Sequence, residues 1–86
     1  MPAYQLKYTP EALEAISKLP NNLKGIAERV VIHLASSPFS GKKLSGNLKG
    51  ILSTRVTRRY RLLYLVKHKE KEIIVLDLKH RKEVYE

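Results

Sequence analysis

The sequence has 86 residues, of which 43% are hydrophobic and 29% are charged, and it contains no cysteine. These values predict a single soluble domain over residues 1–86, and they exclude a disulfide framework and a thiol nucleophile. The longest apolar runs, residues 62–66 and 73–76, are too short to span a bilayer. We expect no signal peptide and a cytoplasmic location.

The net charge of +9 is concentrated in the second half of the chain. Residues 1–40 hold four basic and three acidic residues, a net of +1, so residues 41–86 carry the remaining +8. This concentration of positive charge favours a polyanionic partner, although a basic surface kept for solubility would have the same composition. Nucleic acid is favoured over a membrane because the sequence has no strongly basic amphipathic helix.

The first half of the chain reads as a strand followed by two helices. Residues 3–8 alternate, with Tyr4, Leu6 and Tyr8 on one face that we assign to the core. A helix starts at Thr9, which can cap it, and continues to about residue 19. Residues 20–22 (Pro-Asn-Asn) then break the chain and offer a new N-cap for a second helix that ends near residues 36–38.

Residues 39–50 form a connector that contains three glycines and three lysines. A basic, glycine-rich loop can hold phosphate, and Lys49 is a candidate for that contact, but the spacing of a nucleotide P-loop is absent. The alternative is a plain connector whose Leu44 and Leu48 pack on the core.

Three strands follow, over residues 51–56, 60–66 and 73–79. Their short polar connections predict an antiparallel meander. The predicted fold is therefore α+β with two layers and the order β-α-α-β-β-β, in which two helices cover one face of the sheet. The other face is left for water or for a partner.

The pleat of the last two strands predicts their register. Placing the fully apolar faces together on the helices gives three cross-strand pairs: Leu62 with Leu78, Tyr64 with Leu76, and Val66 with Ile74. The open face then has an apolar floor of Leu63, Leu65, Ile73 and Val75.

The same register gathers basic side chains on the open face. Arg61 lies opposite Lys79, with Arg81 on the same face, and a three-residue turn at 57–59 places Arg55 opposite Arg61. Cross-strand like charges destabilise a sheet, whereas arginine matches phosphate in two-point contact, so the cluster favours an anion site. The alternative is that each arginine lays its stem over leucine and keeps its head in water.

Three segments of the sequence resemble the RelE/ParE superfamily of toxins from toxin–antitoxin systems. Residues 43–50 (Lys-Leu-Ser-Gly-Asn-Leu-Lys-Gly) resemble its connector, residues 60–64 (Tyr-Arg-Leu-Leu-Tyr) its arginine strand, and residues 80–85 (His-Arg-Lys-Glu-Val-Tyr) its closing motif. With the opening Tyr-Thr-Pro-Glu-Ala and the Leu-Pro between the helices, the resemblance runs along the whole chain, and the closing motif favours the RelE branch.

The resemblance implies a toxin that acts as a ribosome-dependent endoribonuclease, cutting mRNA in the A site and inhibiting translation. By the same resemblance, Arg61 contacts phosphate, and Arg81 and Tyr85 are catalytic. The implied partners are a cognate antitoxin, the ribosome and mRNA; operator DNA is bound only through the antitoxin complex, and no membrane is involved. ParE-type members poison DNA gyrase instead, so a gyrase-directed or non-catalytic toxin is the alternative, followed by a plain nucleic-acid-binding module.

Two departures from the family pattern concern the cations around the site. The strand before the arginine strand carries only Arg55 where some RelE proteins have paired lysines, and the turn contains Arg58 and Arg59 instead of glycine. We assign these cations, with Lys49 and Lys79, to RNA binding.

The expected chemistry needs no metal or other cofactor. The three histidines lack ligand spacing, and arginines can hold the charge of the transition state. Tyr85 is the candidate base, since neighbouring cations lower a tyrosine's pKa. His80 is a second candidate base. However, strand alternation places it on the same face as Leu76 and Leu78, which is the core face, and this favours a structural role.

Overall fold

The computed structural model describes residues 4–44 and 50–83 of the chain. The elements in chain order are β1 (Gln5–Tyr8), α1 (Pro10–Ser17), α2 (Asn21–Ser36), β2 (Lys42–Lys43), β3 (Leu52–Arg55), β4 (Tyr60–Lys67), β5 (Glu72–His80) and the 3-10 turn η2 (Arg81–Glu83). This order confirms the predicted α+β fold. In the described part of the chain, no helix is long and apolar enough to cross a membrane.

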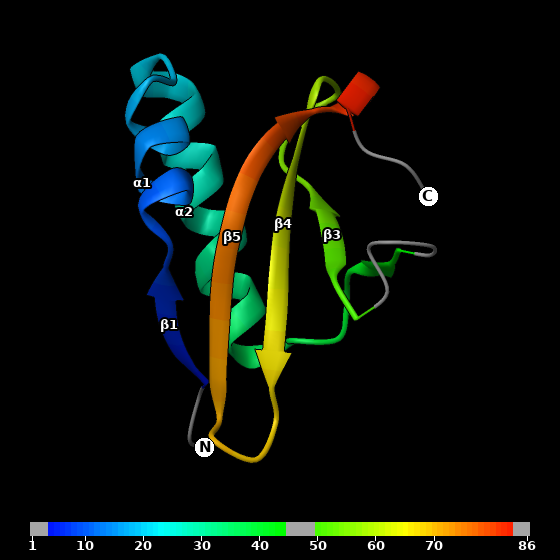
Figure 1. Ribbon diagram of the computed structural model, residues 1–86. Coiled ribbons are helices and arrows are strands. Elements are labelled where there is room, and N and C mark those ends of the chain that lie inside the picture. The colour runs from blue at the N-terminus through cyan, green and yellow to red at the C-terminus, as the bar shows by residue number, and fades with distance from the viewer. Residues whose placement is uncertain (1–3, 45–49, 84–86) are drawn as a thin grey trace.

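The strands form one five-stranded sheet in the order β1-β5-β4-β3-β2 (Figure 1). β1 runs parallel to β5, and the other neighbours are antiparallel. The short strand β2 was not predicted, because its two residues lie in the glycine-containing connector. It forms where Gly41 passes close to the sheet: a Cβ at this position would lie 2.7 Å from the carbonyl oxygen of Ser53.

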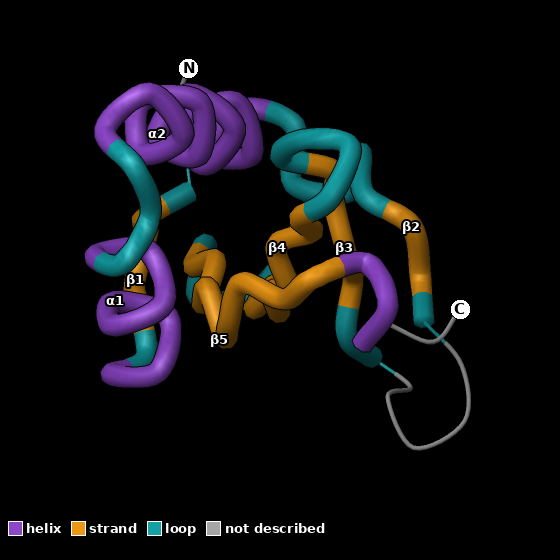
Figure 2. Tube along the Cα trace, turned by 90° about the horizontal axis from the view of Figure 1, so that it is seen from above, coloured by secondary structure: helices purple, strands orange, loops and turns teal. Residues whose placement is uncertain are grey.

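The helices leave one face of the sheet open. β4 and β5 lie in front of α2 in Figure 1, and Figure 2 shows α2 behind the sheet and α1 beside β5 at its edge. Ala12 of α1 is fully buried, as are Ala27 and Val31 of α2, so small and branched side chains let both helices pack closely. The face of β3, β4 and β5 away from α2 is called the open face below.

Both helices start where the sequence predicted. The Thr9 hydroxyl accepts the N–H of Ala12 at 3.1 Å and caps α1. The N-cap of α2, expected within residues 20–22, is Pro20, which makes no side-chain hydrogen bond there. The fixed φ of proline, here −56°, already suits a helix entry.

The prediction that Tyr8 is a core residue is wrong, because Tyr8 ends the edge strand β1 and its side chain is 39% exposed.

The predicted register is correct in one half of the β4–β5 ladder and wrong in the other. Leu62 pairs with Leu78 and Leu63 with Asp77, but Tyr64 pairs with Val75, so Leu76 is an extra residue that forms a β-bulge. The predicted pairs Tyr64–Leu76 and Val66–Ile74 are therefore wrong.

The bulge changes which residues of β5 face the helices. Ile73 and Val75 are fully buried in the core cluster and do not lie on the open face as predicted. The residue that faces outward beside Leu65 is its partner Ile74, which is half-buried. The apolar floor of the open face is therefore Leu63, Leu65 and Ile74.

Candidate nucleic-acid interface

A row of three cations crosses the open face at the end of the sheet near the β3–β4 turn. Arg55 pairs with Arg61, and Arg61 pairs with Lys79, so the three residues lie side by side on β3, β4 and β5. These pairs are as predicted. Neighbouring strands are about 4.8 Å apart, so the three charges fall within reach of one or two phosphates. We call Arg55, Arg61 and Lys79 the cation row.

Arg61, the middle member of the cation row, is held by a buried hydroxyl. Its Nε donates to the Oγ of Ser53 at 3.1 Å, and Ser53 is fully buried on β3. A hydrogen bond through Nε fixes the plane of the guanidinium group. The arrangement orients the arginine for an anion above the sheet.

Lys79, at the β5 end of the row, lies next to a carboxylate. Its Nζ is 3.4 Å from Oδ2 of Asp77, and Oδ1 of Asp77 accepts the N–H of Leu78 at 2.8 Å. Asp77 pairs with Leu63 and therefore shares the open face. It lowers the net charge of the site and keeps the lysine near the sheet.

The arginines beyond the strands gather at the β3–β4 turn. Arg58 and Arg59 of this turn are exposed, and the N–H of Arg59 is held by the Thr57 hydroxyl at 3.2 Å. Arg81 starts η2, and its backbone N–H donates to the carbonyl of Arg59 at 2.7 Å. Figure 1 shows η2 beside this turn. Arg81 thus extends the cation row toward the turn rather than along β5.

His80 has the surroundings of a structural residue. It pairs with Tyr60, whose ring it meets edge-on at a centroid distance of 5.7 Å. Its Nδ1 accepts the N–H of Lys82 at 3.3 Å, which places the proton of the neutral ring on Nε2. The contacts with Tyr60 and Lys82 are consistent with the structural alternative for His80.

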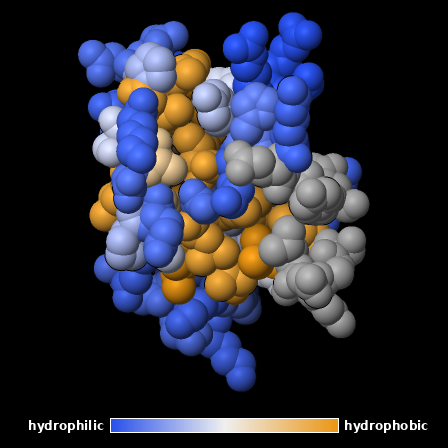
Figure 3. Space-filling view, turned by 45° about the horizontal axis from the view of Figure 1, so that its top comes forward, coloured by the Kyte–Doolittle hydropathy of each residue, from blue (hydrophilic) through white to orange (hydrophobic). Residues whose placement is uncertain are grey.

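The floor of the site is apolar. Figure 3 shows hydrophobic side chains in the middle of the open face with hydrophilic ones around them. Leu63 is buried, and Leu65 and Ile74 are half-buried. Such a floor under a row of cations suits a ligand with both charged and flat apolar parts. Lys49 and Tyr85, the other two predicted site residues, lie outside the described residues.

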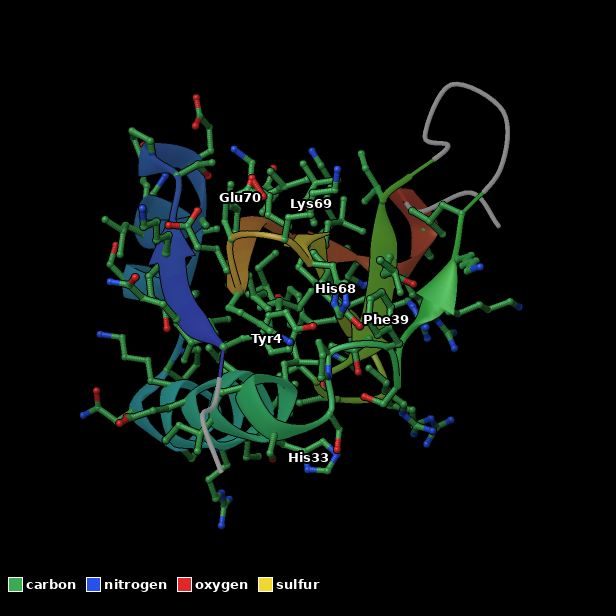
Figure 4. The ribbon with its side chains drawn as sticks, turned by 90° about the horizontal axis from the view of Figure 1, so that it is seen from below. Tyr4, His33, Phe39, His68, Lys69 and Glu70 are labelled. Carbon is green, nitrogen blue, oxygen red and sulfur yellow. The ribbon has the colours of Figure 1, made fainter. Side chains whose placement is uncertain are left out.

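A second cluster of aromatic and histidine side chains lies at the opposite end of the sheet. The Tyr4 hydroxyl and Nδ1 of His68 are 2.5 Å apart, and the Phe39 ring lies 6.1 Å from that of His68 (Figure 4). His33 points away from this cluster in the same view. Among the described residues, no three His, Asp or Glu side chains are grouped so that they could hold a metal ion.

Two residues of the site were placed by the sequence but not recognised. Strand alternation puts Ser53 and Asp77 on the same face as Arg61 and Lys79, but the sequence alone indicates no role for either residue. Alternation along the strands predicts the face on which the two residues lie. Their contacts with Arg61 and Lys79 depend on side-chain geometry, which the alternation does not predict. A buried serine beside an arginine on the same face is the signal that would have indicated the first contact.

The sequence and the fold both match proteins of known class. The profile of the family described as ParE toxin of type II toxin-antitoxin system, parDE, matches residues 6–85. The chain belongs to this family and is a toxin of a type II toxin–antitoxin system. Comparison with proteins of curated function gave no match.

Solved structures with the same fold include RelE-like toxins, which supports the RelE branch. The RelBE2 toxin–antitoxin complex from Mycobacterium tuberculosis is 28% identical, with a TM-score of 0.83 over 92% of this chain and 99% of that one. The archaeal RelE-RelB complex from Pyrococcus horikoshii is 24% identical, with a TM-score of 0.77 over 95% and 99%. A YoeB/ParE toxin from Agrobacterium tumefaciens is 18% identical, with a TM-score of 0.79 over 90% and 98%.

Proposed function

We propose that this toxin is a metal-independent endoribonuclease that cuts mRNA in the ribosomal A site and so inhibits translation. The observation that carries the proposal is the cation row, because Arg55, Arg61 and Lys79 lie in register on one open face. Placing three like charges on neighbouring strands costs stability, and an anion held above them offsets that cost. The phosphodiester of mRNA is such an anion.

A few side chains share the steps of the proposed RNA cleavage. The 2′-oxygen attacks the neighbouring phosphorus, the 5′-oxygen of the next nucleotide leaves, and the products are a 2′,3′-cyclic phosphate and a 5′-hydroxyl end. Arg61 and Arg81 hold the negative charge that develops on the phosphorane oxygens, and their hydrogen bonds need no reorganisation during the reaction. Tyr85 accepts the proton of the 2′-hydroxyl, and a water or a second protonated group supplies one to the leaving oxygen.

The remaining cations position the RNA. Arg58 and Arg59 at the exposed turn, with Lys49 and Lys79, bind phosphates next to the scissile one. A cognate antitoxin covers the open face in the resting complex, and operator DNA is bound only through that complex. Two of the similar solved structures are the RelBE2 toxin–antitoxin complex and the RelE-RelB complex, which supports an antitoxin partner here.

The test is cleavage on programmed ribosomes, read by primer extension on the mRNA. Arg61→Ala removes a charged hydrogen bond worth about 1.5–3 kcal/mol, so we expect a rate about ten- to hundredfold lower. Tyr85→Phe deletes only the hydroxyl and should lower the rate about 10²–10⁴-fold. The matched control is Lys69→Ala, which removes an exposed cation at the opposite end of the sheet (Figure 4) and should cut normally.

A gyrase-directed toxin is the second candidate, because the matching family is described as ParE toxin. Supercoiled DNA with purified gyrase distinguishes the two functions. Trapped DNA cleavage complexes, together with intact mRNA on ribosomes, would replace the ribonuclease proposal. Cleaved mRNA without trapped complexes would support it.

A further inference from the structure

A second basic cleft lies between α2 and β3, on the side of the sheet that α2 covers. It has a volume of about 390 Å³. Its lining residues are Ile26, Arg29, Val30, His33, Thr54 and Arg55. No residue of this set except Arg55 belongs to the candidate interface described above.

The cleft follows from the spacing of α2 and from the short strand β2. Ile26, Arg29, Val30 and His33 are separated by three or four positions, so they form one ridge along the helix. Among residues 4–44 and 50–83, β2 pairs only with Leu52 and Ser53, so no described strand pairs with the outer edge of β3 at Thr54 and Arg55. The ridge and the open edge form the two walls of the cleft.

The chemistry of the lining fits a nucleic-acid backbone. Arg29 and Arg55 are exposed, and no acidic side chain of the described residues forms an ion pair with either. Ile26 and Val30 are half-buried and supply an apolar floor on which a ribose or a base can rest. The His33 ring adds a flat polar group at one end. By contrast, the groove beside α1 is lined by three carboxylates, those of Glu11, Glu14 and Asp77.

Arg55 connects the cleft with the cation row. It lies opposite Arg61 in the β3–β4 ladder and also lines the cleft. A strand of RNA whose phosphates follow the row from Lys79 through Arg61 to Arg55 therefore reaches the edge of the sheet at the mouth of the cleft. Arg29 is the second arginine that lines the cleft.

We propose that the cleft between α2 and β3 binds the backbone of single-stranded RNA that continues from the cation row. This inference rests on the proposed function only in that both sites bind the same RNA. Binding in the cleft depends on Arg29, His33 and the apolar ridge and requires no bond to be cut. The cleft thereby lengthens the RNA footprint around the open edge of β3.

The experiment measures binding separately from cleavage. A fluorescent single-stranded 2′-O-methyl RNA is titrated with the full-length protein, and anisotropy is followed at several salt concentrations. This probe lacks the attacking hydroxyl, so its binding is the same whether or not the protein is a ribonuclease. Arg29→Ala should lower the affinity about three- to tenfold at low salt, since it removes one exposed charged contact. It should also reduce the slope of log K against log salt by about 0.7, the value for one phosphate contact with a single strand.

The matched control is Lys24→Ala. Lys24 lies on the same helix and carries the same charge, but it lines the groove on the other side of α2, with Tyr8 and Glu28. This variant should bind the RNA with the affinity and salt slope of the unmodified protein. In NMR spectra, the amide signals of the ridge residues should shift on RNA addition, and at equal sub-saturating RNA they should shift less in Arg29→Ala than in the unmodified protein.

An unchanged affinity and slope in Arg29→Ala would overturn the proposal, as would equal losses in Arg29→Ala and Lys24→Ala. The second result would mean that only overall charge matters. If the cleft instead takes an acidic protein segment, RNA binding is unaffected by Arg29→Ala, and the proposal fails. Failure of the ribonuclease proposal is recognised separately, by intact mRNA on ribosomes.

Discussion

The hydroxyl of Thr9 donates to the carbonyl oxygen of Leu76 at 2.7 Å, while the backbone N–H of Thr9 donates to the carbonyl of Val75 at 3.0 Å. Leu76 is the extra residue of the β5 bulge, so Thr9 holds the bulge from outside the β4–β5 ladder. The same hydroxyl caps α1. One side chain thus joins the start of α1 to the bulge of β5. On one side of this bulge Leu78 faces the core, and on the other side Val75 and Ile73 do.

The first prediction is that Thr9→Val destabilises the protein. Valine keeps the shape and the β-branch, but it removes the cap and leaves the Leu76 carbonyl without its donor. The expected loss in the free energy of unfolding is about 1–3 kcal/mol. Urea denaturation followed by circular dichroism measures it.

Thr9→Ser is the matched control for this prediction. Serine retains the hydroxyl and should keep most of the stability. If Thr9→Val is as stable as the unmodified protein and only Thr9→Ser is destabilised, the methyl group of Thr9 matters rather than its two hydrogen bonds.

The bulge also explains how far the sequence could predict the sheet. Alternation of apolar residues correctly predicted the pairing of Leu62 with Leu78 and the cation row at the same end. It failed beyond Leu63, because a run in which Ile73, Ile74, Val75 and Leu76 are all apolar fits either face. The residues of β5 that face the core change at the bulge, and the bulge is held by hydrogen bonds from Thr9, which is distant in sequence. The local pattern of apolar residues carries no information about these bonds.

The candidate site was predictable where it depends on strand parity. Arg55, Arg61 and Lys79 lie as expected for that reason. The position of Arg81 was less predictable because the chain leaves β5 after His80 and turns toward Arg59. The roles of Lys49 and Tyr85 stay predictions.

The second prediction concerns the positioning of Arg61 by Ser53. Ser53→Ala removes the acceptor of Nε and leaves the guanidinium in place but less well oriented. Because a hydrogen bond to a charged group contributes about 1.5–3 kcal/mol, we expect mRNA cleavage to be slower, up to about tenfold, with a smaller change in RNA affinity. Single-turnover cleavage on ribosomes gives the rate, and anisotropy with 2′-O-methyl RNA gives the affinity.

Ser53→Thr and Arg61→Lys separate positioning from a general loss of packing. Threonine retains the acceptor and should restore the rate where the buried site accommodates its methyl group. In the Arg61→Lys background, the Nε donor is absent, so Ser53→Ala should have little further effect. An equal loss in both backgrounds would mean that Ser53 acts through packing alone.

The third prediction is that Asp77→Asn strengthens RNA binding. Asparagine can still accept the N–H of Leu78, but it no longer attracts the ammonium of Lys79, 3.4 Å away. Exposed ion pairs of this kind contribute about 0.2–1 kcal/mol, so the affinity for 2′-O-methyl RNA should rise about two- to fivefold. A steeper salt dependence should accompany it.

Glu14→Gln is the control for the Asp77 prediction, since it also removes one negative charge, from the exposed Lys18–Glu14 pair of α1. A similar gain in affinity in this variant would show that net charge, rather than release of Lys79, is responsible.

The fourth prediction concerns Gly41, whose N–H donates to the Tyr64 hydroxyl at 3.0 Å. A Cβ at this position would overlap the Tyr64 hydroxyl and the carbonyl of Ser53. Gly41→Ala should therefore lower the free energy of unfolding by about 1–3 kcal/mol, the usual cost of overpacking. Gly25→Ala, at a helical glycine with open space around it, should instead be neutral or stabilising.

The fifth prediction is that Tyr64 makes the protein sensitive to alkaline pH. Burial raises the pKa of the Tyr64 hydroxyl above its ordinary value of 10.0, and the hydrogen bond from Gly41 only partly offsets this. The folded state therefore retains the proton at a pH where the unfolded chain has lost it. The contribution to stability is fully present below about pH 10 and is lost as the pH rises through the raised pKa of the folded state.

Tyr64→Phe tests this by removing the titrating group and its hydrogen bond to the Pro38 carbonyl, 2.9 Å long. Near neutral pH, the variant should be less stable by about 1–3 kcal/mol, because the Gly41 N–H and the Pro38 carbonyl lose their partner. Above about pH 10, its stability should fall less steeply than that of the unmodified protein. The pKa of Tyr8 is also raised, by burial and by the charge of Glu28, but Tyr8 is present in both proteins and cancels in the difference. Parallel stability curves from neutral pH into the alkaline range would show that the Tyr64 hydroxyl does not titrate with unfolding.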